Sequence, residues 1–247
     1  MTLESYLDII INFLKDYLED NKQQCYILGL SGGVDSSLVA AIGKKAVGKD
    51  KLFTYSMPID SLKDDEDDAY KLANILDINF QVLDLSKPYH EMIKIYEDKN
   101  IQLDMATKAN LKARLRMATL FAIAQNKKGL VLGTDNKDER YTGYFTKFGD
   151  GAADLLPIAH LIKKEVRDAA LLLDVPAELA NRVPSAGLYE GQKDEDELKV
   201  TYDELDAYLL GKNVSETAKQ RIEYLHKISE HKRKDIPTPM EFIRDGK

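Results

Sequence analysis

The sequence predicts an α/β fold in which helices flank a doubly wound parallel sheet. Short apolar segments alternate with longer segments of helical periodicity over most of the 247 residues. Strands that alternate with helices are typical of βαβ units, whose strands run parallel. A glycine-rich turn directly after the first apolar segment supports this fold class, because ligands of such sheets bind beyond the carboxyl ends of the strands.

Apolar runs mark the predicted strands, and apolar residues at every third or fourth position mark the helices. The first half of the chain gives a helix over 3–18, a strand over 25–30, a helix over 36–47, a strand over 52–57, a helix after the acidic run 64–68 and a strand over 80–85. The second half gives helices over 89–97 and 104–126, a strand over 129–133, a loop over 134–157, a helix over 162–172, a polar irregular segment over 184–200 and helices over 202–210 and 215–231. The loops after Leu30, Met57 and Gly133 therefore meet at one edge of the sheet.

Composition narrows the class of protein. No run of about 18 apolar residues is present, so no transmembrane helix is predicted, and the N-terminus lacks the basic region of a signal peptide. The single Cys25 excludes an internal disulfide and a Cys-x-x-Cys metal site. A formal net charge of −7 weighs against a nucleic-acid partner. We therefore expect one cytoplasmic domain over residues 1–247, with no membrane or nucleic-acid partner.

The turn after the first predicted strand reads Gly29-Leu-Ser-Gly-Gly-Val-Asp-Ser-Ser37. Its glycines let the backbone approach a phosphate, and the following helix N-terminus supplies free N–H groups. Asp35 would repel a phosphate, but it suits a Mg²⁺ ion that bridges to the phosphates. The turn is neither a Walker A loop nor a Gly-x-Gly-x-x-Gly dinucleotide loop. A simple strand–helix turn with a capping acid is the alternative interpretation.

The string Ser31–Ser36 resembles the loop of the ATP pyrophosphatase superfamily, whose members cleave ATP between the α and β phosphates and pass AMP to an acceptor. Nearly the whole chain also resembles NAD synthetases within that superfamily. This second resemblance rests on Leu132–Pro157, Asn110–Met117, Pro184-Ser185, Tyr202–Asp206 and Glu230–Arg233. It implies an adenine nucleotide alpha hydrolase-like, Rossmann-like fold. It also implies that ATP and ammonia convert deamido-NAD (nicotinate adenine dinucleotide) to NAD, AMP and pyrophosphate through an acyl-adenylate, the last step of NAD biosynthesis.

The resemblance assigns roles to individual residues. ATP would be bound by Gly29, Leu30, Ser31, Gly32, Gly33, Val34, Asp35, Ser36, Ser37, Thr134, Lys163 and Ser185. The dinucleotide would contact Arg114, Tyr144, Phe145, Lys147, Asp154, His231 and Lys232. Asp35 and Glu139 would hold Mg²⁺. Asp150 and Lys163 would be catalytic, Asp150 through a role with ammonia and Lys163 by stabilising the leaving pyrophosphate. The chain departs from the family at Asn136, where a small residue or His is usual, and at Ser185, where Thr is usual.

Chemical reasoning on the residues agrees with these roles. Displacement at phosphorus concentrates charge on phosphate oxygens, so two carboxylates that share a metal, together with a lysine, are expected at the site. Asp35 and Glu139 follow strands whose ends meet at one edge, so they can converge. Taken singly, Glu139, Lys147 and Lys163 would each be interpreted as ordinary surface residues, and only their joint placement supports a site.

The nitrogen source should be free ammonia. Only 30 residues precede Ser31, which leaves no room for a glutaminase domain, and Cys25 lies inside a predicted strand. The resemblance also implies a homodimer. Two other functions remain open: another ATP pyrophosphatase, such as a tRNA-modifying enzyme, and a non-catalytic nucleotide sensor. Acidic charge and the lack of paired cysteines disfavour the first, and Asp35, Glu139, Asp150 and Lys163 together disfavour the second.

Overall fold

A computed structural model describes residues 1–61, 63–182 and 193–243 of the chain. Its centre is a parallel four-stranded sheet formed by β1 (Cys25–Gly29), β2 (Leu52–Ser56), β3 (Asn79–Val82) and β4 (Gly129–Leu132). The strand order is β3-β2-β1-β4. The chain therefore leaves β1 in one direction along the sheet and returns on the other side of β1 as β4. Ligands of doubly wound sheets bind at this kind of switch point, which here lies between the ends of β1 and β4.

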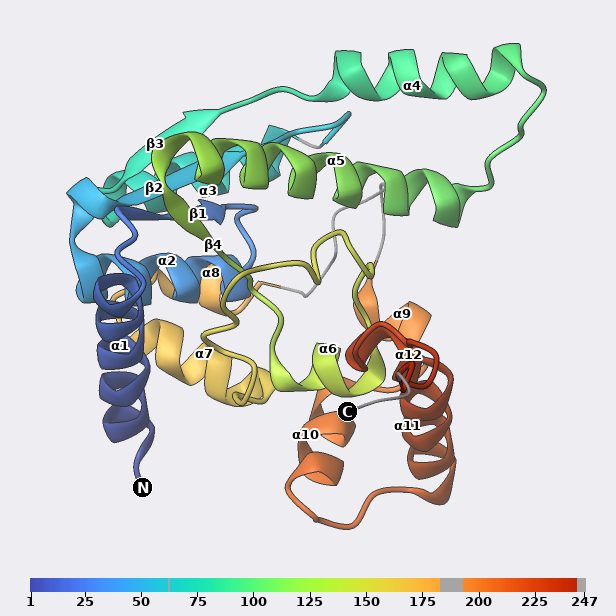
Figure 1. Cartoon of the computed structure of the whole chain (residues 1–247). Coiled ribbons are helices and arrows are strands. Elements are labelled where there is room, and N and C mark those ends of the chain that lie inside the picture. The colour runs from blue at the N-terminus through green and yellow to red at the C-terminus, as the bar shows by residue number, and fades with distance from the viewer. Residues whose placement is uncertain (62, 183–192, 244–247) are drawn as a thin grey trace.

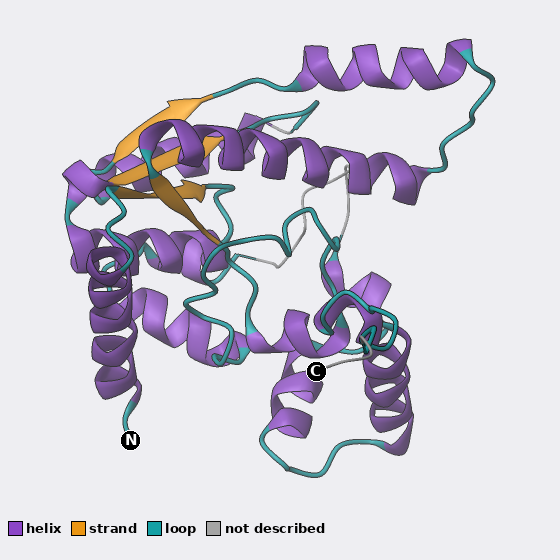
Figure 2. Ribbon diagram, viewed as in Figure 1, coloured by secondary structure: helices purple, strands orange, loops and turns teal. Residues whose placement is uncertain are grey.

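Helices cover both faces of the sheet (Figure 1, Figure 2). One face packs against α1 (Leu3–Asp20), α2 (Val34–Val47), α3 (Lys63–Ile75), α7 (Lys163–Leu172) and α8 (Ala177–Ala180). A short 3₁₀ turn, Lys49–Lys51, connects α2 to β2. On the other face, the C-terminal half of α5 (Met105–Lys127) packs against buried residues of β1, β2 and β4. The expected α/β architecture with two helical layers is therefore confirmed.

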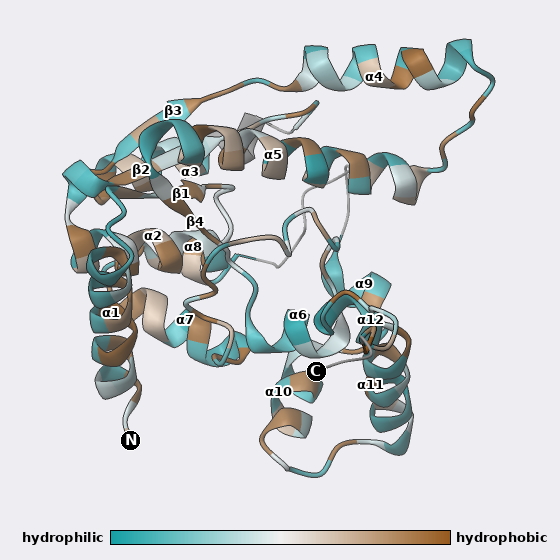
Figure 3. Cartoon of the chain, in the orientation of Figure 1, coloured by the Kyte–Doolittle hydropathy of each residue, from teal (hydrophilic) through white to brown (hydrophobic). Residues whose placement is uncertain are grey.

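A helical arm extends beyond the sheet. It consists of α4 (Ser86–Asp98), the N-terminal half of α5 and the connection between them, and Figure 1 shows it reaching away from the strands. Apolar side chains are exposed along the arm, including Ile95, Ile101 and Met105, and Figure 3 shows hydrophobic stretches on α4 and in the connection.

The C-terminal helices form a separate cluster beyond the carboxyl edge of the sheet (Figure 1). Its helices are α6 (Lys137–Thr142), α9 (Asp194–Leu198), α10 (Tyr202–Leu209), α11 (Glu216–Ile228) and α12 (Glu230–Arg233). Leu198, Tyr202, Leu205 and Ile222 are buried at its centre. The loop that follows β4 leads into this cluster through α6.

Three expectations about local structure were wrong. The predicted loop 134–157 contains α6, which a capping box starts: Asn136 Oδ1 accepts from Glu139 N, and Glu139 Oε2 accepts from Asn136 N. The polar segment 184–200 contains α9, whereas its part from 184 to 192 lies outside the described residues. The last predicted helix divides into α11 and α12 at Ser229, whose Oγ donates to the carbonyls of Leu225 and Thr142.

None of the helices in the described ranges is both long enough and apolar enough to cross a membrane.

Candidate active site at the carboxyl edge of the sheet

The loop after β1 forms a compact, hydrogen-bonded turn. Ser31 Oγ lies 3.1 Å from Ser36 Oγ, Gly33 N donates to Ser31 Oγ at 3.3 Å, and Ser37 Oγ donates to the Gly33 carbonyl at 2.7 Å. Gly32 has a φ of 82°, a conformation that favours glycine. The N-cap residue Gly33 provides no side-chain acceptor for the first turn of α2. The N–H groups at the start of α2 can therefore bind an anion such as a phosphate.

The other residues predicted to bind ATP lie around this loop. Gly29 ends β1, and Leu30 and Val34 are buried on either side of the turn. Thr134 follows β4 and is half-buried. Ser185 lies outside the described residues. The structure therefore brings the loop after β1 and the loop after β4 together, as the strand order requires.

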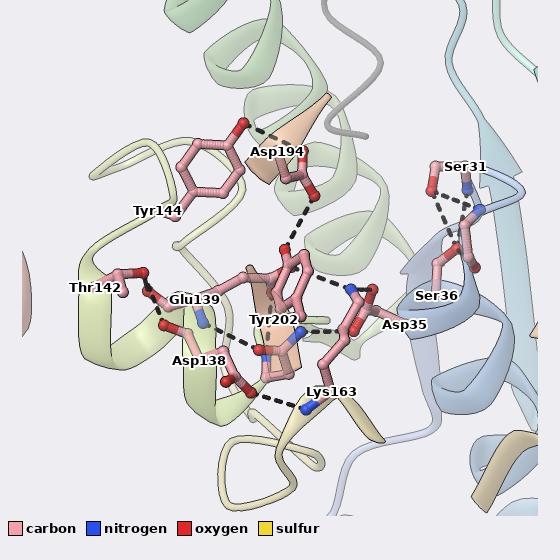
Figure 4. Close-up of polar contacts among 12 residues, drawn as sticks. Ser31, Asp35, Ser36, Asp138, Glu139, Thr142, Tyr144, Lys163, Asp194 and Tyr202 are labelled. Atoms are coloured by element: carbon pink, nitrogen blue, oxygen red, sulfur yellow. Dashed lines mark hydrogen bonds and ion pairs between the residues drawn. The ribbon is translucent and has the colours of Figure 1, made fainter. Parts of the chain in front are cut away.

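Three predicted residues converge between these loops. Lys163, the first residue of α7, places its Nζ 2.6 Å from Asp35 Oδ2 and 3.7 Å from Glu139 Oε1. Asn136 Nδ2 donates to the other Asp35 oxygen at 2.8 Å. The Lys163 side chain is 2% exposed, and the side chains of Asp35 and Glu139 are each 17% exposed. Figure 4 shows these groups pointing toward one another from α2, α6 and α7.

Asp35, Glu139 and Lys163 form a triad, in which burial and neighbouring charges shift the pKa values of Lys163 and Glu139. Burial would lower the pKa of Lys163, but the charges of Asp35 and Glu139 outweigh burial and raise this pKa above its ordinary value. Lys163 therefore stays an ammonium ion at neutral pH. Burial, and next the charge of Asp35, raise the pKa of Glu139 well above its usual range, while Lys163 opposes this effect. The Lys163 ammonium therefore offsets part of the electrostatic cost of bringing the two acids together.

Two further acids lie in this region without having been predicted as site residues. Burial, with a smaller contribution from Asp150, raises the pKa of Asp135 to about 8, and Asp135 Oδ2 has no hydrogen-bond partner within the part of the chain that the structure describes. Its ion-pair partner, Arg140, is 3.7 Å away. Burial and the neighbouring Asp206 raise the pKa of Asp138 to about 8. The edge of the sheet therefore carries more acid groups than the sequence analysis assigned.

The residues predicted to bind the dinucleotide form a second group. Arg114 Nη2 donates to the Lys147 carbonyl at 3.3 Å, and Lys147 Nζ donates to the His231 carbonyl at 2.5 Å. Lys232 Nζ donates to the Phe145 carbonyl at 2.6 Å and lies 5.3 Å from the centre of the Phe145 ring. These contacts join α5, α12 and the loop that follows α6, which are far apart in the sequence.

A cavity of about 270 Å³ adjoins this second group, and Tyr144, His231 and Lys232 are among the residues that line it. The Tyr144 hydroxyl donates to Asp194 at 3.1 Å and to Glu197 at 2.7 Å. The cavity is smaller than the 300–1,000 Å³ typical of ligand pockets. Within this chain it can enclose only part of a dinucleotide.

Asp150 and Asp154 occupy different environments. Asp150 is exposed, and both of its carboxylate oxygens accept from Thr146 N at 3.2 Å. Asp154 Oδ2 accepts from Val131 N at 2.7 Å and so fixes the chain against β4. The structure gives Asp154 a clear role in the fold, and its predicted contact with the dinucleotide stays a prediction.

Sequence reasoning missed several residues that contact the triad. Asn136 orients Asp35, and the Tyr202 ring lies 4.9 Å from Lys163 Nζ. The Tyr202 hydroxyl donates to Asp194 at 3.0 Å, so Asp194 joins Tyr202 to Tyr144 (Figure 4). The stretch Tyr202–Asp206 was recognised as part of a signature, but nothing in the sequence indicates which of its side chains faces Lys163.

The geometry is compatible with a magnesium site. Asp35 and Glu139 converge on one cation, the Lys163 ammonium. Among the described residues, no group of three or more potential metal ligands from His, Cys, Asp and Glu occurs. Two carboxylates suit Mg²⁺, which is usually held by one or two carboxylates together with water and substrate phosphates.

Comparison with known proteins agrees with this site. Residues 6–236 match the sequence model of the NAD synthase family. The chain is 44% identical to an NH(3)-dependent NAD(+) synthetase of Mesoplasma florum, over 99% of this chain and 100% of that protein.

Solved structures share the fold. An NMN synthetase from Francisella tularensis has a TM-score of 0.92 and 39% identity, with 97% of this chain and 99% of that chain covered. An NH3-dependent NAD synthetase from Campylobacter jejuni has a TM-score of 0.80 and 26% identity, with 98% of this chain and 100% of that chain covered.

Proposed function

The chain belongs to the NAD synthase family, and from this premise we propose that it amidates deamido-NAD with ammonia, at the expense of ATP, to give NAD, AMP and pyrophosphate. In the first step, an oxygen of the nicotinate carboxylate bonds to the α-phosphorus, and pyrophosphate leaves. In the second step, the ammonia nitrogen bonds to the acyl carbon, AMP leaves with the electron pair of the broken bond, and the nitrogen loses a proton. Membership of this family disfavours the tRNA-modifying and sensor alternatives.

The observation that carries the proposal is the meeting of Asp35, Glu139 and Lys163 beside the N-terminus of α2. The free N–H groups at the start of α2 bind the phosphates of ATP, and the Lys163 ammonium stabilises the negative charge that develops on pyrophosphate. Asp35 and Glu139 would hold Mg²⁺, which supplies Lewis-acid stabilisation of the phosphate oxygens when bound.

The second group of residues would bind the acceptor. Arg114, Lys147, His231 and Lys232 place basic side chains next to the loop that carries Phe145 and Asp150. Their charge suits the phosphates and the carboxylate of deamido-NAD. Asp150 would accept the proton that ammonia loses, since burial raises the pKa of its carboxyl group and so makes it a stronger base.

Ammonia rather than glutamine would be the nitrogen source. The matched relatives from M. florum and C. jejuni are named as ammonia-dependent enzymes. Cys25, the single cysteine of the sequence, is 3% exposed within β1, and burial raises the pKa of its thiol. A thiol in this environment is a poor nucleophile, so it would not replace the cysteine of a glutaminase. We propose a cytoplasmic location, with which the free, buried thiol of Cys25 agrees.

A mononucleotide acceptor is a second candidate. The solved structure with a TM-score of 0.92 is an NMN synthetase, and the cavity of about 270 Å³ is small for a dinucleotide. Both acceptors carry the same nicotinate carboxylate, so the chemistry is identical and only the length of the acceptor differs.

A homodimer would complete the acceptor site. The helical arm exposes Ile95, Ile101 and Met105, and a partner subunit that covers this arm would bury them. A dinucleotide that extends beyond the cavity would then contact the partner. The oligomeric state in solution, measured by sedimentation with and without acceptor, tests this part of the proposal.

The decisive assay mixes the purified protein with ATP, Mg²⁺, ammonium and either deamido-NAD or nicotinate mononucleotide, and measures pyrophosphate together with the amidated product. Equal amounts of NAD and pyrophosphate support the proposed reaction, and a faster reaction with the mononucleotide supports the second candidate. Glutamine in place of ammonium should give no product. Pyrophosphate without an amidated product from either acceptor would overturn the proposal.

A further inference from the structure

The main-chain N–H of Lys163 is bound by two carboxylates at once. It donates to Asp138 Oδ2 at 2.8 Å and to Asp206 Oδ1 at 3.1 Å. The other oxygen of Asp206 accepts from Lys164 N at 3.0 Å. Asp138 is 1% exposed and Asp206 is 6% exposed. Two buried acids from two different helices, α6 and α10, therefore meet at the first residue of α7.

Capping of α7 accounts for Asp206, which accepts from two N–H groups of the first turn, but it does not explain why a second buried acid shares the N–H of Lys163. One carboxylate is enough to satisfy one N–H group, whereas burying a second acid beside it costs free energy. A local acid is also available, because Glu165 Oε2 accepts from Ile162 N at 3.0 Å. Asp138 and Asp206 instead lie 25 and 43 residues away from Lys163 in the sequence. A contact of this kind fixes one residue relative to two other helices.

The same two helices also supply partners for the Lys163 side chain. On α6, Glu139 is adjacent to Asp138, and its Oε1 lies 3.7 Å from Lys163 Nζ. On α10, Tyr202 lies one turn before Asp206, and its ring lies 4.9 Å from the same nitrogen. Each helix thus contributes one group to the main chain of Lys163 and one group to its ammonium.

We infer that Asp138 and Asp206 are positioning residues, which fix the main chain of Lys163 so that its long side chain reaches the phosphate-binding edge of the sheet. A lysine side chain is a flexible four-carbon chain, so the location of its ammonium depends on a fixed backbone. Because α10 belongs to the C-terminal cluster that carries His231 and Lys232, Asp206 also ties the ATP side of the site to the acceptor side. The inference rests on the proposed function, since it takes Lys163 to act on ATP.

The experiment compares Asp206→Ala and Asp206→Asn with Glu165→Ala, a matched control that removes an acceptor from the same end of α7 without contacting Lys163. Steady-state rates are measured with saturating ammonium and varied ATP and acceptor, and thermal unfolding is recorded for each protein. We expect Asp206→Ala to lower kcat about 10- to 100-fold, because displacement of about 1 Å can cost 100-fold. The KM for each substrate should stay within about threefold, since binding contacts are retained.

Two further results identify positioning rather than loss of stability. Asp206→Asn keeps an oxygen that can accept from the Lys163 N–H, so its kcat should be close to that of the wild type. Glu165→Ala should lower the melting temperature and leave kcat close to wild type. Unchanged kcat in Asp206→Ala, or an equal loss of kcat in Glu165→Ala, would overturn the inference. If Asp206→Ala does not fold, Asp138→Ala is read against the same control, and Asp138→Asn is then the variant that keeps the oxygen. An inactive wild-type protein would instead count against the proposed function itself.

Discussion

The ammonium of Lys163 lies 2.6 Å from Asp35 Oδ2 in a place where the lysine side chain is only 2% exposed. A charged lysine is rarely buried unless it is paired, and here Glu139 is a second partner at 3.7 Å. The pair joins α2, which we propose binds the phosphates of ATP, to α7. Its role in the fold and its role in the reaction can therefore be separated by experiment.

Replacement of Lys163 by Ala should lower both the stability of the fold and the rate of the proposed reaction. Two carboxylates would be left close together without a cation, so we expect the free energy of unfolding to fall by about 3–5 kcal/mol. Turnover should fall by at least about 10²-fold, because a preorganised charge at the phosphates is lost. Chemical denaturation and the release of pyrophosphate measure the two effects.

The neighbouring Lys164 is the matched control, because it pairs with Asp168 at 2.6 Å while 69% exposed. Lys164→Ala should leave turnover close to wild type, since exposed ion pairs contribute little.

The effect of Mg²⁺ on the melting temperature is a second measurement on the same variants. If Asp35 and Glu139 hold it, Mg²⁺ alone should raise the melting temperature of Lys163→Ala more than that of the wild type. An equal rise in both proteins would count against a shared cation site.

Glu139→Gln separates charge from fold. Glu139 Oε2 accepts from Asn136 N in the capping box of α6, and glutamine keeps an acceptor there. We therefore expect a small change in melting temperature, a large loss of turnover and a higher requirement for Mg²⁺. Glu165→Gln makes the same substitution at the start of α7, where the side chain accepts from Ile162 N, and should keep turnover. Comparable turnover in the two variants would remove Glu139 from the site.

The parallel sheet could be predicted from the sequence, whereas many contacts between residues of the site could not. The four strands and their parallel order follow from apolar runs separated by helices, and the strand order places Asp35 and Glu139 at the same edge. The capping box of α6 was also readable from Asn136 and Glu139, yet the polar stretch around it suggested a loop.

Other contacts depend on packing between distant segments. Asp206 reaches Lys163 across 43 residues, and Tyr202 covers its ammonium. Neither residue has a regular spacing from Lys163 along the chain, so a single sequence contains no pattern that predicts these contacts. Asp135 illustrates the same limit, because nothing in the sequence around it shows that this acid is only 3% exposed in the folded protein.

Asp135 should make stability depend on pH. Burial and the charge of Asp150 raise the pKa of Asp135 from 3.8 to about 8 in the folded protein. The folded state therefore binds more protons than the unfolded chain between about pH 4 and pH 8, so the free energy of unfolding falls as the pH rises through this range. Asp135→Asn removes the contribution of this group to the pH dependence, while Asp138 and Glu139 keep theirs in both proteins.

The measurement is chemical denaturation of both proteins at pH 5 and pH 8. The stability of Asp135→Asn relative to wild type should increase over this interval by at least about 1 kcal/mol, since each unit of pKa shift corresponds to about 1.4 kcal/mol. A constant difference between the two proteins would show that Asp135 does not change its protonation on folding in this range.

Gly143 connects α6 to the acceptor side of the site. Its φ is 69°, and a Cβ atom there would overlap the side chain of Ser229. The Gly143 carbonyl accepts from Lys232 Nζ at 2.7 Å. Gly143→Ala should therefore move α12 and Lys232. Backbone strain and overpacking should lower the free energy of unfolding by about 2–4 kcal/mol. The KM for the acceptor should rise more than the KM for ATP.

Gly211→Ala is the control that measures backbone strain alone, because Gly211 has a φ of 72° and no atom of the described residues lies within 4 Å of the position that its Cβ would occupy. A KM for the acceptor that changes equally in both variants would show that Ser229 and Lys232 do not transmit the effect.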